Sequence, residues 1–353
     1  MSIESAGDHP LGAELGGEVP PRAIDVSGAL TAPESEGFST ILTEMLAAGL
    51  DSIYVVGSGS EANDLALRIA RYATGGKGIV TTRRAFHGTT VETAAISPAV
   101  GGLAAVAGWV RLVDPPIGDG ATFAAAVRSA AYELRDSEYG FAGMIVDPVF
   151  TSDGVHPAAG LIDAGEAVRD AGGLMIVDET GGSLASVGPS VWAFEDSKLT
   201  PDILTFLATS PGELPIAVVT TRSTIDTGPA LTTSRFRATD AALASAERAL
   251  ASIRTGEAGG ESKTVGDYLA AGVALIASAG TVVSGVRGRG LRIGFDSGRS
   301  DELLDALGAA GVIAGRAGPD TLLIHAPLGF SMADADALLE RMYSATLSIE
   351  TAT

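Results

Sequence analysis

Residues 53–64, which read IYVVGSGSEAND, decide the fold. The first four residues are apolar and end at a glycine, a pattern typical of a strand buried inside a parallel sheet. From Glu61 to Tyr72 the apolar residues return at helical spacing, which predicts a helix directly after the turn. The stretch therefore predicts a strand, a tight turn and a helix, the repeating unit of α/β proteins.

The turn in this unit, Gly57–Asp64, has the composition of a phosphate-binding loop. The amides of Gly59 and Ser60 are expected to open the helix, where the positive end of the helix dipole favours an anion. The hydroxyls of Ser58 and Ser60 would add donors. A plain turn with a serine cap explains the same residues, so the loop alone leaves its ligand open.

Apolar runs and amphipathic stretches alternate beyond this unit as far as about residue 238. This alternation predicts an α/β fold, with a mostly parallel sheet covered by helices on both faces. Strands are expected at 53–56, 78–82, 143–149, 174–177, 203–207 and 216–220, and helices at 38–49, 61–72, 121–134 and 161–171.

The order of expected helices and strands changes after residue 238. Two helices, 239–253 and 265–278, precede strands expected within 282–295 and at 311–312 and 321–325, and a last helix over 332–348. This order predicts a smaller α+β unit. The predicted division is an N-terminal segment over residues 1–44, irregular as far as residue 37, a large α/β domain over 45–255 and a small domain over 256–353.

Composition excludes several classes of site and partner. The 353 residues include no cysteine, which excludes disulfides and thiolate chemistry, and the four histidines show no metal-ligand spacing. A net charge of −20 repels phosphate backbones, so nucleic acid is not an expected partner. No apolar run is long enough to cross a membrane and no secretory signal opens the chain, so a cytoplasmic protein is expected.

Two further features lie at the ends of expected strands. Phe86 and His87 follow the second strand, where an aromatic pair could stack on a planar ring, although a loop aromatic often only fills a gap. Asp178 ends the strand at 174–177, and a carboxylate there lies in the ligand crevice of an α/β sheet. Asp178 would be placed to pair with a protonated ring nitrogen; a structural carboxylate is the alternative.

Taken in order, SGSEAN, FHG, IVDPV, LMIVDET, TPDILTF and LPIAVV resemble the motifs of class III aminotransferases, the ornithine and 4-aminobutyrate type of pyridoxal-phosphate (PLP) fold type I. The resemblance covers roughly residues 45–345. Each motif is weak alone, but the ordered set is strong. The resemblance implies PLP or pyridoxamine phosphate as cofactor, and a dimer whose active sites lie at the subunit interface.

The resemblance also assigns roles to single residues. Ser58, Gly59 and Ser60 match the loop that binds the cofactor phosphate, and Asp178 matches the carboxylate that pairs with the pyridine nitrogen. The remaining matches are Phe86, which stacks on the ring, followed by His87 and Gly88; Thr180, in place of a valine packed against the ring; and Thr233, for the threonine that reaches the neighbouring subunit's cofactor phosphate.

The chain departs from the family at the catalytic centre. The Schiff-base lysine falls on Ala208, and the chain has only three lysines, Lys77, Lys198 and Lys263. An alanine can neither form the internal aldimine nor carry the proton. Other positions also differ from the family pattern. Gly181 stands where the family has a glutamine, Leu323 where it has the arginine that binds a substrate carboxylate, and Ser186 where it has a further arginine.

Three functions follow from this pattern, and the sequence leaves them open. The leading hypothesis is a non-catalytic subunit that pairs with a lysine-bearing aminotransferase homologue and contributes Thr233 to its site. The second is an enzyme that uses non-covalent PLP or pyridoxamine phosphate, with His87 or His325 as base. The third is a site repurposed without PLP, built on Asp147, Asp178 and Glu179.

Overall fold

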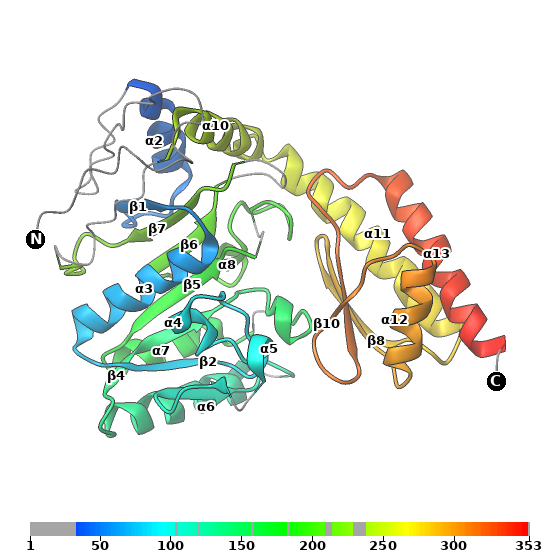
Figure 1. Cartoon of the computed structure of the whole chain (residues 1–353), viewed down its shortest axis with the longest axis horizontal. Helices are drawn as coiled ribbons and strands as arrows, with labels where there is room; N and C mark the ends of the chain where they lie inside the picture. Colours follow the sequence, from blue (N-terminus) through cyan, green and yellow to red (C-terminus); the bar gives the residue numbers. More distant parts are fainter. Residues whose placement is uncertain are drawn as a thin grey trace, which may run out of the picture.

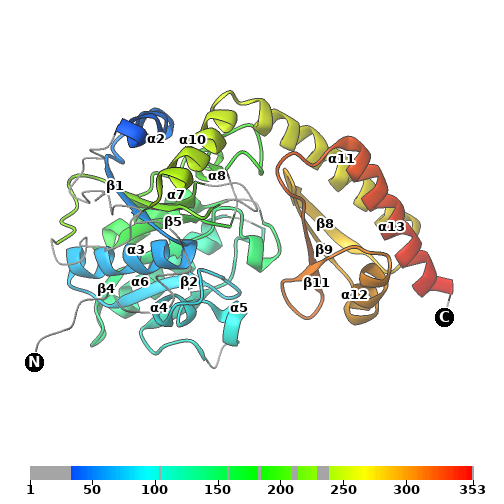
Figure 2. The same cartoon turned by 45° about the horizontal axis from the view of Figure 1, so that its top comes forward.

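The computed structural model describes residues 33–102, 105–118, 120–156, 159–181, 184–208, 214–228 and 238–351. Figures 1 and 2 show two units, a large one built around a central sheet and a small one beside it, joined by α10 (Asp240–Arg254) and α11 (Glu257–Ala279). In the part of the chain that is described, no helix is long and apolar enough to cross a membrane.

The large unit contains a seven-stranded sheet in the order β1-β7-β6-β5-β4-β2-β3. Only β7 runs antiparallel to its neighbours, so the expectation of a mostly parallel α/β sheet is confirmed. The strands are β1 (Ser52–Val56), β2 (Gly78–Thr82), β3 (Val110–Val113), β4 (Phe141–Val146), β5 (Leu174–Glu179), β6 (Ile203–Leu207) and β7 (Ala217–Thr221).

Helices cover both faces of this sheet, which explains why its strands are mostly apolar rather than alternating between apolar and polar residues. One face packs against α3 (Gly59–Thr74), through residues such as Leu65 and Ile69. The other face packs against α2 (Pro33–Met45), α6 (Gly120–Arg135), α7 (Leu161–Asp170) and α10. Short helices α4 (Val91–Ala94), α5 (Pro98–Gly101) and α8 (Ala193–Asp196) lie in the connections.

The small unit is a four-stranded antiparallel sheet backed by three helices. Its strands, in the order β10-β11-β9-β8, are β8 (Ser284–Arg289), β9 (Arg292–Asp296), β10 (Gly315–Arg316) and β11 (Thr321–His325). Its helices are α11, α12 (Ser300–Ala309) and α13 (Met332–Thr351). Their apolar residues form a core of their own between Val265 and Ile349.

Several elements differ from the sequence prediction. The first helix covers 33–45 rather than 38–49, so residues 33–37 are not irregular, and Phe38 and Leu42 bury completely in the core of the large unit. Strand β3 was not expected, because it is a short edge strand with an arginine among its four residues. Residues 311–312 lie outside the strands, and the strand in this part of the chain is β10 (Gly315–Arg316).

Trp192 anchors the connection between β5 and β6. Its ring is completely buried, packs edge-on against Phe206 at 4.8 Å between centroids, and donates from Nε1 to the carbonyl of Met45 at 2.7 Å. Replacing a buried aromatic side chain with alanine typically costs about 3–5 kcal/mol, the lost transfer energy plus a cavity.

We therefore expect Trp192→Ala to lower the free energy of unfolding of the large unit by about 3–5 kcal/mol, measured by urea unfolding. Trp192→Phe keeps an aromatic ring and loses the hydrogen bond, so its cost should be nearer about 1 kcal/mol. A loss below about 1 kcal/mol for the alanine variant would show that this ring is not part of the core on which the large unit depends.

Candidate functional site

The candidate site lies where the carboxyl ends of β2, β5 and β6 meet the first turn of α3. In parallel strands these ends share one edge of the sheet, which is where ligands bind in open α/β folds. The register places Asp178 of β5 beside Thr205 of β6. Both side chains face α3, because Ile176 and Ile203, two residues earlier in each strand, pack on that face.

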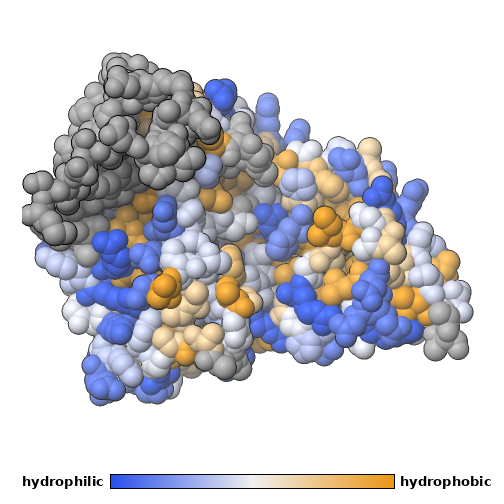
Figure 3. All heavy atoms as spheres, in the orientation of Figure 1, coloured by the Kyte–Doolittle hydropathy of each residue, from blue (hydrophilic) through white to orange (hydrophobic). Residues whose placement is uncertain are grey.

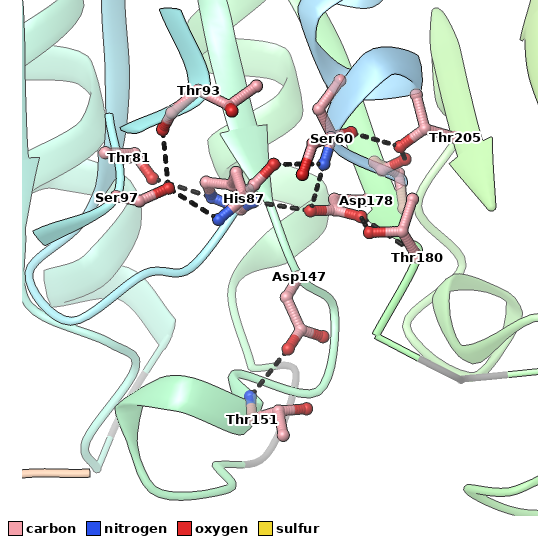
Figure 4. A network of polar contacts seen from close by, with 12 residues as sticks. Ser60, Thr81, His87, Thr93, Ser97, Asp147, Thr151, Asp178, Thr180 and Thr205 are labelled. Carbon is pink, nitrogen blue, oxygen red and sulfur yellow. Dashed lines mark hydrogen bonds and ion pairs between the residues drawn. The ribbon is translucent and has the colours of Figure 1, made fainter. Parts of the chain in front are cut away.

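The Asp178 carboxylate is the centre of a buried polar network (Figure 4). The side chain is 3% exposed, and each oxygen accepts two hydrogen bonds. Oδ1 accepts from the amide of Thr180 at 2.8 Å and from its hydroxyl at 2.6 Å. Oδ2 accepts from Nδ1 of His87 at 2.7 Å and from the amide nitrogen of Asn63 at 2.8 Å. Four donors satisfy a carboxylate completely, so this charge is held without an exposed partner.

His87 is fixed on both sides of its ring. Nδ1 donates to Asp178, and Nε2 lies 3.0 Å from the hydroxyl of Thr81 on β2. Its backbone amide donates to Ser97, and its carbonyl accepts from Asn63. With a side chain only 1% exposed and both nitrogens engaged, His87 positions Asp178 and is not open to solvent for proton transfer.

Asn63 was missed in the sequence analysis, although it lies inside the phosphate-loop motif. It is completely buried on α3, donates to both Asp178 and His87, and accepts from the hydroxyl of Thr205 at 2.6 Å. A polar residue on the apolar face of an amphipathic helix was the available signal. Its partners come from elements far apart in sequence, so only the tertiary structure shows what it joins.

The loop that precedes α3 has the features of an anion site. Ser58 caps the helix by accepting from the amide of Glu61, and the Glu61 carboxylate accepts from the amide of Gly57 at 2.8 Å. The amides of Gly59 and Ser60 have no acceptor among the described residues, as expected for the first turn of a helix. The hydroxyl oxygen of Ser60 accepts from the amide of Thr89.

The other residues predicted to contact the cofactor lie around the same edge or outside the described part of the chain. Phe86 is about half exposed beyond β2, and the hydroxyl and amide of Thr180 bind Asp178. A side chain at Gly59 would meet Cβ of Thr180 at 2.8 Å, so the threonine lies directly against the phosphate loop. Ala208 follows β6 at the same edge and is completely buried. Thr233 lies outside the described residues.

All three lysines lie away from this edge. Lys77 and Lys198 precede the amino ends of β2 and β6, and Lys263 lies on α11, where it pairs with Asp267 at 2.5 Å. In strands that run parallel to β5, the amino end is the edge opposite Asp178. No lysine of this chain is therefore positioned to reach a ligand between Asp178 and the phosphate loop.

The residues at this edge could hold the phosphate and the ring of PLP, but they include no lysine that could bind it covalently. The amides of Gly59 and Ser60 are available to a phosphate, and Asp178 lies on the face of the sheet that α3 covers. A pyridine nitrogen could donate to Asp178 only by sharing or displacing a donor already bound there. The hydroxyl of Thr180 is the one that can rotate away without breaking backbone structure.

Two further acids lie at this edge. Glu179 is on the opposite face of β5 from Asp178, and Asp147 follows β4, the neighbouring strand. Asp147, after β4, accepts from the amides of Val149 and Thr151, and burial raises its pKa. Glu179 is completely buried and accepts from the amide of Phe194, while its second oxygen has no partner among the described residues. Burial raises the pKa of Glu179 to about 8, with the negative charge of Asp147 acting in the same direction.

The raised pKa of Glu179 in the folded state predicts that the stability of the protein depends on pH. The unfolded state ionises Glu179 first, near its ordinary pKa, so the free energy of unfolding falls as pH rises from about 4.5 to about 8. Glu179→Gln should remove this fall. We expect the variant to gain stability relative to wild type, on the order of a few kcal/mol, between pH 5 and pH 8, measured by urea unfolding.

Glu166→Gln on the exposed face of α7 is the matched control, and its difference from wild type should stay flat across the same pH range. A flat difference for Glu179→Gln as well would show that Glu179 is ionised in the folded protein.

Comparison with known proteins shows which family this chain is related to. The family model for class III aminotransferases matches residues 22–346. The chain is 28% identical over 331 residues to an alanine–glyoxylate aminotransferase 2 homologue of Arabidopsis thaliana, covering 86% of this chain and 69% of that protein. It is 29% identical over 315 residues to a diaminobutyrate–2-oxoglutarate aminotransferase of Rhizobium meliloti, covering 83% of this chain and 66% of that protein.

Solved structures give the same fold. A phospholyase from Arthrobacter in complex with phosphoethanolamine superposes with a TM-score of 0.79 at 25% identity, covering 90% of this chain and 82% of that one. A transaminase from Virgibacillus superposes with a TM-score of 0.80 at 19% identity, covering 93% and 82%. Fold type I is thereby confirmed, and the chain belongs to the class III aminotransferase family.

Proposed function

We propose that this chain is a non-catalytic subunit that pairs with a lysine-bearing class III aminotransferase homologue. The observation that carries the proposal is the position of the three lysines, all away from the carboxyl edge where Asp178 and the phosphate loop lie. Ala208, the residue matched to the Schiff-base lysine, is a buried methyl group at that edge. Without a lysine amine the chain lacks both the covalent anchor and the proton carrier of transamination.

The part of the site that matches the family motifs supports binding rather than chemistry. Asp178, His87, Asn63 and Thr205 form a closed, buried network that holds one carboxylate in a fixed position. The free amides of Gly59 and Ser60 would hold the phosphate of PLP or pyridoxamine phosphate without a covalent bond. When bound, such a cofactor supplies an electron sink for carbanions, and this chain contributes only its orientation.

The structure gives less support to an enzyme that works without lysine. That hypothesis needs a base, and the two candidates were His87 and His325. His87 is buried with both nitrogens engaged. His325 ends β11 and lines a hollow formed only by small-unit residues, and loss of water together with the charge of Arg292 lowers its pKa to about 4. Neither is placed to move a proton beside Asp178.

The proposal is tested by purifying the chain alone and after co-expression with a lysine-bearing homologue. Alone, we expect no borohydride-stable attachment of PLP and no transamination with any amino donor. The co-expressed pair should copurify as a heterodimer, attach PLP covalently through the homologue only, and turn over. A symmetric homodimer of this chain with transaminase turnover of its own would overturn the proposal.

Thr180 offers a second test, directed at cofactor binding. Thr180→Val keeps the shape of the side chain but removes the hydroxyl that donates to Asp178, so one acceptor position becomes open to a ring nitrogen. We expect pyridoxamine phosphate to bind up to about tenfold more tightly, by isothermal titration calorimetry, because a hydrogen bond to a charged group contributes about 1.5 kcal/mol.

Thr264→Val on the exposed face of α11 is the control and should bind as wild type does. Unchanged affinity for Thr180→Val would show that no ligand atom reaches Asp178.

A further inference from the structure

A second cleft lies on the other side of β2. Thr81 and Thr82 are neighbours in this strand, so their side chains point to opposite faces of the sheet. Thr81 contacts His87 in the candidate cofactor site, whereas Thr82 donates to the carboxylate of Asp153. Beyond Asp153 lies a cleft of about 600 Å³ between the two units, lined among others by Arg84, His156, Arg287, Asp296 and Asp320.

The units approach closely at the back of this cleft. A side chain at Gly294 of β9 would come within 2.1 Å of the Gly154 carbonyl. Arg287 of β8 donates to that same carbonyl at 2.7 Å and forms a two-pronged ion pair with Asp296 at 2.8 and 3.0 Å. These contacts fix the small unit against the loop that follows β4, so the cleft has a defined shape.

Most charged groups in the cleft already have partners. Arg83 pairs with Asp114 at 2.8 Å, and Arg287 pairs with Asp296. Asp153 is 4% exposed and accepts from the Thr82 hydroxyl and from the backbone amide of Arg84. Burial lowers the pKa of His156, and Nε2 of its ring lies 3.1 Å from the backbone carbonyl of Asp153. These groups form the walls of the cleft.

Arg84 and Asp320 are the exceptions. Neither side chain has a hydrogen bond or an ion pair with any described residue, and the two do not pair with each other. Gly318 lies against the Arg84 guanidinium so closely that a Cβ there would be 2.4 Å from the central carbon of that group. A half-buried guanidinium held against backbone without an acceptor is costly, and a ligand anion would remove that cost.

We propose that this cleft binds a small zwitterion, with Arg84 holding its carboxylate or phosphate and Asp320 holding its ammonium group. The charges favour a zwitterion over a simple anion. Three arginines line the cleft, Arg83, Arg84 and Arg287, against four aspartates, Asp114, Asp153, Asp296 and Asp320. An anion alone would meet no excess of positive charge, whereas a ligand with both charges satisfies both uncommitted groups.

The ligand class is a primary amine with an anionic group a few bonds away. Aminoalkyl carboxylates and aminoalkyl phosphates share this chemistry. The site is separate from the candidate cofactor site and does not depend on the proposed lack of catalysis, since Arg84 and Asp320 make no contact with the Asp178 network.

Calorimetric titration of the full-length protein tests the proposal, with 4-aminobutyrate and phosphoethanolamine as probes and ethanolamine, acetate and inorganic phosphate as single-charge comparisons. At least one zwitterion should bind about tenfold or more tightly than each single-charge compound. Arg84→Gln and Asp320→Asn should each weaken that binding about tenfold or more. The probe that binds distinguishes a carboxylate ligand from a phosphate ligand.

Matched controls are Arg111→Gln, which breaks a surface ion pair with Glu133, and Asp163→Asn on the exposed face of α7. Both should bind as wild type does. Asp320 is exposed, so its variant tests the cleft even where Arg84→Gln fails to fold. Zwitterion binding that neither variant weakens, inorganic phosphate binding as tightly as phosphoethanolamine, or no binding of any probe would each overturn the proposal.

Discussion

The buried Asp178 carboxylate is the interaction on which the large unit is organised. A carboxylate that is 3% exposed would be strongly destabilising unless protein donors replaced its water. Four donors come from three places in the chain: Asn63 on α3, His87 after β2, and the amide and hydroxyl of Thr180 after β5. Satisfying one charge therefore fixes the helix, two strand ends and the intervening loops relative to one another (Figure 4).

The Asp178 network is complete within the protein. Its members hold one another in place through protein–protein hydrogen bonds, so the network needs no cofactor to be complete. Ala208 takes no part in the network, because its amide donates to the carbonyl of Ile216 and its side chain is only a buried methyl group. The residue at position 208 can thus vary without disturbing the Asp178 network or the turn that precedes α3.

The two faces of β2 divide the carboxyl edge into two sites. The Thr81 face belongs to the Asp178 network, and the Thr82 face belongs to the cleft shared with the small unit. In the space-filling view, hydrophilic and hydrophobic residues are interspersed over both units on the face that is seen (Figure 3).

The sequence by itself determined most of the architecture, including the turn between β1 and α3. Apolar runs at 53–56, 78–82 and 203–207 became β1, β2 and β6 almost residue for residue, because a strand buried on both faces must be apolar along its length. The edge strand β3 and the start of α2 were not predictable in this way, since neither has a continuous apolar pattern.

Only the tertiary structure decided which polar residues act together. Thr205 and Thr81 gave no distinct signal, and the position of Asn63 on the apolar face of α3 did not indicate its partners, because these lie up to 142 positions away in the chain. The same holds for Arg84 and Asp320, which lie in different units and line one cleft only after folding. Periodicity along the chain determines elements, whereas the pairing of charges and donors depends on distances that periodicity does not contain.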